Sequence, residues 1–142
     1  MKILHIGDLH LGKKIGGYSL LEDQKYFLDE TISLMKEKGI SHIIMAGDIY
    51  DISTPSGDAI SLFASFLKKI KDNNFKAFII SGNHDSKARL SYLNELIQDD
   101  GIFINTDIKN AVKPFTVDGI NYYLIPYTTS SEINSVFDRE FK

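Results

Sequence analysis

The chain has 142 residues, of which 43% are hydrophobic and 25% are charged, values typical of one folded globular domain. Its net charge of −3 argues against a protein that passively coats nucleic acid. It does not argue against a nuclease, because bound cations would change the local charge at an acidic site. The lack of cysteine excludes disulfides and thiolate metal sites. Since no apolar run is long enough to span a bilayer, we expect a cytoplasmic protein with no membrane contact.

Apolar runs alternate with helical patterns over most of the chain. Strands are expected at residues 2–6, 41–46, 76–81 and 102–105, and helices at residues 22–38, 57–71 and 89–98. Gly39 is expected to end the first helix. Strands that alternate with helices of this length predict an α/β fold with a mainly parallel sheet.

The pattern changes after residue 110. Two short apolar segments, residues 112–117 and 121–125, flank Asp118-Gly119, which is typical of a β-hairpin. Residues 130–141 then read as a helix capped by Ser130 or Ser131.

Each predicted helix has an apolar face. The expected inward residues are Phe27, Leu28, Thr31, Ile32 and Met35 in the first helix, Ala59, Ile60, Phe63, Leu67 and Ile70 in the second, and Leu90, Leu93 and Ile97 in the third. Further apolar residues widen these faces, namely Leu62, Phe66, Tyr92 and Leu96. They indicate either a deep core or a contact with a second copy of the chain.

The most informative residues follow three of the predicted strands. The first strand is followed by Gly7-Asp8-Leu9-His10, the second by Gly47-Asp48-Ile49-Tyr50-Asp51 and the third by Gly82-Asn83-His84-Asp85. Ligands in α/β proteins bind at the carboxyl ends of parallel strands, so these side chains should meet at one edge of the sheet. Carboxylate, amide and imidazole groups together suit Mn²⁺, Mg²⁺, Fe²⁺ or Zn²⁺. An Asp such as Asp48 has two oxygens and could bridge two ions.

These motifs, in this order, resemble the first three motifs of the calcineurin-like metallophosphoesterases. The resemblance implies a four-layer α/β/β/α sandwich, of which this chain would supply an N-terminal portion. The segments around the motifs, including Asp8-Leu9-His10-Leu11-Gly12 and Ser81-Gly82-Asn83-His84-Asp85-Ser86, are similar to the SbcD nuclease subunits of bacteria. That similarity runs through Ile125-Pro126-Tyr127 and implies a DNA exonuclease and endonuclease that acts in repair and recombination with an SbcC-type ATPase.

The resemblance also implies a role for each site residue. Asp8 and His10 would bind one metal, Asp48 would bridge two, and Asn83 would bind the second, with Mn²⁺ the expected ion. His84 would be the catalytic residue that faces the phosphate. Asp51 and Asp85 would orient these groups. The resemblance further implies a homodimer through the helices at residues 57–71 and 89–98.

The chain departs from the family in one respect. The family supplies three more histidines after this point, whereas this sequence has no histidine after His84. We therefore expect residues 1–142 to be the N-terminal part of a metallophosphoesterase domain, to bind metal weakly and to have little activity alone. A general phosphoesterase acting on small phosphates or phosphoproteins, and an inactive module that binds a partner, remain alternatives.

Other polar residues have ordinary explanations. His5 and His42 lie within or beside strands and are expected to be structural. Lys13 and Lys14 could equally be solvated or contact DNA phosphates.

Overall fold

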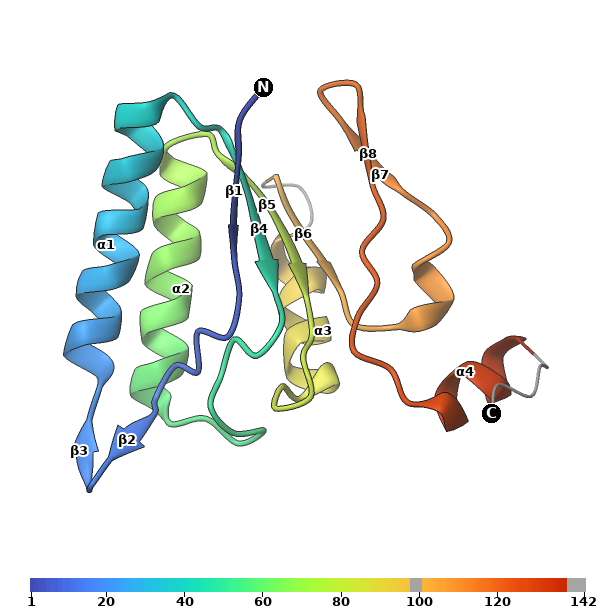
Figure 1. Cartoon of the computed structure of the whole chain (residues 1–142), viewed down its shortest axis with the longest axis horizontal. Helices are drawn as coiled ribbons and strands as arrows, with labels where there is room; N and C mark the ends of the chain where they lie inside the picture. Colours follow the sequence, from blue (N-terminus) through green and yellow to red (C-terminus); the bar gives the residue numbers. More distant parts are fainter. Residues whose placement is uncertain (98–100, 138–142) are drawn as a thin grey trace.

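A four-stranded parallel sheet forms the centre of the protein (Figure 1). This computed structural model describes residues 1–97 and 101–137, without the side chains of residues 94–97. The strands are β1 (Ile3–Ile6), β4 (His42–Ala46), β5 (Lys76–Ile80) and β6 (Ile102–Asn105). They lie in the order β1-β4-β5-β6, and every neighbouring pair is parallel. The predicted α/β fold with a mainly parallel sheet is therefore confirmed.

Three helices pack on the same face of this sheet. They are α1 (Leu21–Lys38), α2 (Gly57–Asp72) and α3 (Lys87–Ile97), and each connects two neighbouring strands. Side chains alternate between the two faces of a strand, and alternate residues of the central strands join the helices in one core. This core includes Ile43, Met45, Ala77, Ile79, Phe63, Ile70 and Leu28. Gly39 ends α1 with a φ of 62°, as predicted.

A β-hairpin covers part of the opposite face. Its strands are β7 (Phe115–Val117) and β8 (Ile120–Tyr122), joined through Asp118-Gly119 as the sequence predicts. Both turn residues have positive φ, 49° and 75°, which an Asp-Gly pair tolerates well. Tyr122 stacks on Phe78 of β5 with ring centroids 3.6 Å apart. The described elements therefore form successive helix, sheet and hairpin layers, as expected for part of a metallophosphoesterase-type sandwich.

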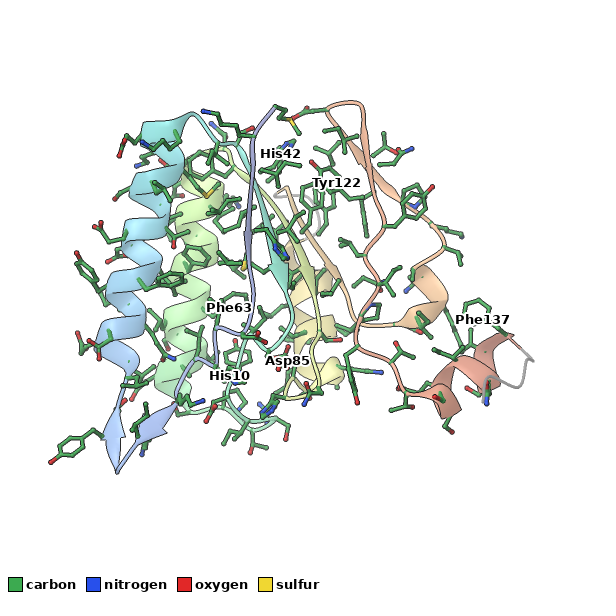
Figure 2. All side chains as sticks on the ribbon, viewed as in Figure 1. His10, His42, Phe63, Asp85, Tyr122 and Phe137 are labelled. Carbon is green, nitrogen blue, oxygen red and sulfur yellow. The ribbon has the colours of Figure 1, made fainter. Side chains whose placement is uncertain are left out.

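His42 connects the hairpin to the amino end of the sheet (Figure 2). Its side chain is fully buried, with Nε2 lying 3.0 Å from Oδ2 of Asp118. The other ring nitrogen, Nδ1, lies 2.9 Å from the hydroxyl of Tyr122. An ionised Asp118 can only accept, so in a neutral imidazole Nε2 donates and Nδ1 accepts from the tyrosine. The predicted structural role of His42 is confirmed.

The structure also contains short elements that the sequence did not predict. A small hairpin of β2 (Lys14–Ile15) and β3 (Tyr18–Ser19) precedes α1, and a short 3-10 helix, η2 (Ile108–Asn110), precedes β7. The β2–β3 turn consists of Gly16 and Gly17, both with positive φ. Turn chemistry determines this hairpin, and its two-residue strands are too short to show a periodic pattern.

The last described helix, α4 (Ser130–Phe137), begins differently from the prediction. Its capping residue is Thr129, whose hydroxyl accepts from the Glu132 amide while the Glu132 carboxylate accepts from the Thr129 amide. The predicted caps, Ser130 and Ser131, are therefore wrong by one or two residues. Lys87 of α3 pairs with Glu132 and holds the pKa of that carboxyl down at about 2.

Some apolar side chains of the sheet and helices are more exposed than expected, and two of the predicted inward residues are wrong. Strand β1 lies at the edge of the sheet, and its residue Ile3 is 38% exposed. Phe27 and Ile60 are 48% and 36% exposed, and Ile60 lines an open pocket with Tyr92 and Leu93 of α3. Helical periodicity gives the direction of a side chain relative to its own helix, and it does not show which part of a wide apolar face the rest of the fold covers. Conversely, Phe66 is only 2% exposed and belongs to the core, so it cannot form the proposed subunit contact. The side chains of Leu96 and Ile97, and the whole of residues 138–141, lie outside the described part of the chain.

Within residues 1–97 and 101–137, no helix combines the length and apolar character needed to cross a membrane.

Replacing Tyr122 with Phe should lower the free energy of unfolding by about 1–3 kcal/mol. The substitution keeps the ring on Phe78 but leaves the buried Nδ1 of His42 without its partner. Urea unfolding followed by circular dichroism measures the change. Tyr123→Phe is the matched control, since Tyr123 is 55% exposed and its loss of a hydroxyl should change stability by less than about 0.5 kcal/mol. Equal effects from the two variants would show that the hydrogen bond to His42 does not stabilise the fold.

Candidate metal centre

The loops that follow β1 and β4 run side by side beyond the ends of the strands. The Asp8 amide donates to the Gly47 carbonyl at 3.2 Å, and the His10 amide donates to the Asp48 carbonyl at 2.9 Å. A further parallel bridge joins Leu11 to Tyr50. This continued pairing places the first two sequence motifs together at the carboxyl edge of the sheet, as the topology predicted.

Three of the predicted metal ligands meet at this edge. Asp8, His10 and Asp48 each offer a ligand atom, and these atoms all lie within 4.8 Å of one another. All three residues adopt the left-handed backbone region, with φ of 53°, 44° and 49°. Residues other than glycine rarely adopt this conformation, and such residues cluster at functional sites. The loops therefore accept backbone strain that brings the three side chains together.

The third loop joins this group through His84. Its amide donates to Oδ1 of Asp48 at 2.9 Å, and its ring lies edge-on to the ring of His10 with centroids 5.0 Å apart. Asn83, the fourth predicted ligand, precedes His84 in the same loop, and its side chain is exposed. The structure thus places all five predicted site residues in adjoining loops.

A hydrogen bond fixes the proton on the His84 ring. Nδ1 lies 2.8 Å from the Asp51 carbonyl oxygen, which can only accept, so Nδ1 carries a hydrogen. In the neutral ring this leaves Nε2 without a proton and able to take one up. Asp51 was expected to orient neighbouring groups, and it makes this contact through its backbone.

Asp85 ties the second and third loops together. Its side chain is 8% exposed and accepts from the backbone amides of Ile49 at 3.2 Å, Tyr50 at 3.0 Å and Gly82 at 2.9 Å. The expected orienting role of Asp85 is therefore exerted on the backbone. Burial, together with the charge of Asp85, raises the pKa of the Tyr50 hydroxyl to about 12.

Two glycines allow these loops to approach so closely. A Cβ atom at Gly82 would lie 2.0 Å from Oδ1 of Asp48, and one at Gly47 would lie 2.9 Å from the Cα of Gly82. Contacts below 3.0 Å require atoms to move, so a side chain at either position would separate the loops.

The donor set fits a divalent cation. Two carboxylates and an imidazole are suitable ligands for Mn²⁺ and related ions. Nε2 of His10 lies 4.0 Å from Oδ2 of Asp48, and Nδ1 of His10 is buried 3.3 Å from Oδ1 of Asp51 without a well-directed hydrogen bond. These side chains gather their donor atoms with little mutual hydrogen bonding, as a cation-binding group would.

The sequence patterns did not predict a role for Gln24, which contacts this region. Gln24, in the first turns of α1, makes three hydrogen bonds to the loop that contains His10. A signal was present in the sequence, since Gln24 occurs four residues before the buried Leu28 and is thus a polar residue on the inward stripe.

Comparison with known families agrees with this arrangement. The family model for calcineurin-like phosphoesterases matches residues 1–140, which is nearly the whole chain. The family binds divalent metals and hydrolyses phosphoesters, and the Asp8, His10 and Asp48 cluster is a candidate for its metal site. The chain belongs to the calcineurin-like phosphoesterase family.

Proposed function

We propose that this phosphoesterase chain is part of a metal-dependent DNA nuclease similar to SbcD, which hydrolyses phosphodiester bonds during repair and recombination. The convergence of Asp8, His10 and Asp48, with the His84 ring 5.0 Å from that of His10, carries the proposal. A nuclease of this kind would act in the cytoplasm beside an SbcC-type ATPase. The resemblance of the segments between the motifs supports that substrate and that partner.

In this proposal the chain contributes ligands to two divalent cations, Mn²⁺ by preference. Asp8 and His10 would hold one, Asn83 the other, and Asp48 would be shared. When bound, such cations can activate a water molecule and neutralise charge on the phosphate. Because Oδ1 of Asp48 already accepts from the His84 amide, ligand and catalytic residue are held in one unit.

His84 would act directly on the substrate. Its Nδ1 hydrogen is held by the Asp51 carbonyl at 2.8 Å, so Nε2 is the nitrogen that can exchange a proton. A protonated Nε2 could donate to the leaving oxygen of the phosphodiester. The exposed position of His84 gives a phosphate access to it.

The β2–β3 hairpin supports DNA as the substrate. It projects from the carboxyl end of the sheet, where the metal centre lies (Figure 1). Its tip carries Tyr18, which is 81% exposed, and Ile15, which is 60% exposed, close to Lys13 and Lys14. Exposed aromatic rings can stack on bases, and lysines can contact phosphates. A groove of about 610 Å³ lies between this hairpin and the loop that begins at Asp51.

We predict that the chain binds Mn²⁺ weakly, since four ligands fill only part of two coordination shells. Asp48→Ala should remove measurable binding. His84→Ala should leave the Mn²⁺ affinity within about threefold but reduce any turnover by about 10²–10⁴-fold, the usual contribution of a general acid. Isothermal titration calorimetry measures the affinities. Two tightly bound ions would contradict the weak-binding prediction, and loss of metal from His84→Ala with retention in Asp48→Ala would reverse the assigned roles.

The substrate is tested by DNA binding. Lys13→Ala combined with Lys14→Ala should reduce the slope of log affinity against log salt by about 2, because each lost phosphate contact contributes roughly 0.9. Fluorescence anisotropy with labelled duplex DNA measures this slope. Lys36→Ala combined with Lys38→Ala removes the same charge from the far end of α1 and should change the slope little. Hydrolysis of p-nitrophenyl phosphate without any DNA binding would instead support a phosphoesterase for small substrates.

We also propose a homodimer through α2 and α3, with a changed set of contact residues. Phe66 is in the core, whereas Ile60 and Tyr92 are 36% and 63% exposed and line an apolar pocket of about 350 Å³ with Pro55 and Leu93. A second copy could place its own exposed apolar side chains on this pocket, which makes the surface suitable for a symmetric contact.

Ile60→Glu combined with Tyr92→Glu should convert the dimer into a monomer, because burying two carboxylates at an apolar contact is costly. Light scattering at micromolar concentration measures the mass. Tyr26→Glu on α1, where the side chain is 68% exposed, is the control and should leave the mass unchanged. A monomeric parent chain, or a double variant that still dimerises, would exclude this interface.

A further inference from the structure

The loop that carries Asp8 and His10 has an unusual backbone. Asp8, His10 and Gly12 all have positive φ, at 53°, 44° and 91°. In residues other than glycine the Cβ atom lies too close to the backbone in this conformation, so the conformation persists only where surrounding contacts fix it. The position of the two ligands therefore depends on whatever contacts hold this loop.

One side of the loop is held by the neighbouring β4 loop. The amides of Asp8, His10 and Leu11 donate to the carbonyls of Gly47, Asp48 and Ile49 at 3.2, 2.9 and 2.9 Å. These bonds use the amide hydrogens of the loop. They leave the carbonyl of Leu9 and the amide of Gly12 to be satisfied from another direction, while the His10 carbonyl accepts from the Lys13 amide at 3.0 Å.

Gln24 of α1 binds the Leu9 carbonyl and the Gly12 amide, and it adds a second donor to the His10 carbonyl. Its Nε2 donates to the His10 carbonyl at 2.8 Å and to the Leu9 carbonyl at 3.2 Å, while its Oε1 accepts from the Gly12 amide at 3.0 Å. Both amide hydrogens and the oxygen of the side chain are thus engaged, and the chemistry of the partners fixes the orientation of the amide. No other side-chain type of this length offers two donors and an acceptor in one plane.

The same loop is confined by α2. A Cβ atom at Gly12 would lie 3.1 Å from Cβ of Ala59, so the loop passes closely between α1 and α2. Gln24 therefore holds the loop by hydrogen bonds on the α1 side, while Ala59 limits its movement on the α2 side. A change at Gln24 should displace the ligands rather than the helices.

We propose that Gln24 is a positioning residue for the metal centre, which holds Asp8 and His10 in their ligand geometry by binding the backbone of Leu9, His10 and Gly12. This inference rests on the proposed metal-binding function. It adds a residue of α1 to a site that the motifs place entirely in the loops after the strands.

The test replaces Gln24 with Met, which keeps the length of the side chain and removes all three hydrogen bonds. The Mn²⁺ dissociation constant should rise about 10–100-fold, the usual effect of losing a group that supports a ligand. In the metal-free protein, hydrogen exchange at the Gly12 amide should become at least about tenfold faster, while exchange at Ile32 and Met35 in the same helix stays unchanged. Calorimetry and nuclear magnetic resonance measure the two effects.

Two further variants sharpen the result. Glu22→Met introduces the same side chain at an exposed position in the first turn of α1 and should behave as the wild type. Gln24→Glu retains the acceptor for Gly12 but sets a carboxylate oxygen against the carbonyls of Leu9 and His10. It should therefore weaken Mn²⁺ binding as Gln24→Met does.

The failure of this inference differs from the failure of the proposed function. A wild-type chain that binds no Mn²⁺ overturns the proposed metal site and the inference with it. If the wild type binds and Gln24→Met binds equally well, the inference alone is wrong. It is also wrong if faster exchange spreads over the whole of α1, because Gln24 would then only stabilise the helix.

Discussion

The candidate metal centre depends most on the three hydrogen bonds that the buried carboxylate of Asp85 accepts. This carboxylate accepts from the amides of Ile49, Tyr50 and Gly82, and therefore joins the loop after β4 to the loop after β5. Hydrogen bonds to a charged group contribute about 1.5–3 kcal/mol each, so this one side chain holds the two loops more firmly than packing at a loop surface could. The Asp48 side chain then reaches the His84 amide across a gap that Gly82 keeps open. Asp48 and His84, the proposed ligand and the proposed catalytic residue, are therefore held together by a contact that involves the backbone of His84.

The carboxyl end of the sheet carries the candidate site, whereas the amino end carries contacts that stabilise the fold. At the carboxyl end, strand pairing continues into the loops. Asp8, His10 and Asp48 adopt the left-handed backbone region there, and their ligand atoms lie close together. At the amino end, His42 bonds Asp118 and Tyr122 and holds the β7–β8 hairpin against the sheet (Figure 2). The anchoring contacts lie away from the site, so the strained loops can serve ligand geometry while the rest of the sheet provides stability.

The wide apolar faces of α2 and α3 show how packing changes the reading of a sequence pattern. Phe66 and Ile60 both fit an apolar helix face, yet the first is in the core and the second lines an open pocket. Helical periodicity gives the direction of a side chain relative to its own helix only. The neighbouring helix decides which part of a wide face is covered, and here α1 lies beside α2 on the same sheet face.

Sequence alone determined the order of the main strands and helices, the Asp118-Gly119 hairpin and the loops that carry the predicted ligands. It could do so because apolar periodicity and turn residues are local, and because parallel strands share a carboxyl edge. The capping box of Thr129 and Glu132 that begins α4 is local as well. Only the tertiary structure decided that Phe27 is exposed. It also decided that Gln24, which follows His10 by 14 residues, binds the backbone of the loop that contains His10. These features depend on how separate elements approach one another, and a local pattern of residues does not show which elements come into contact.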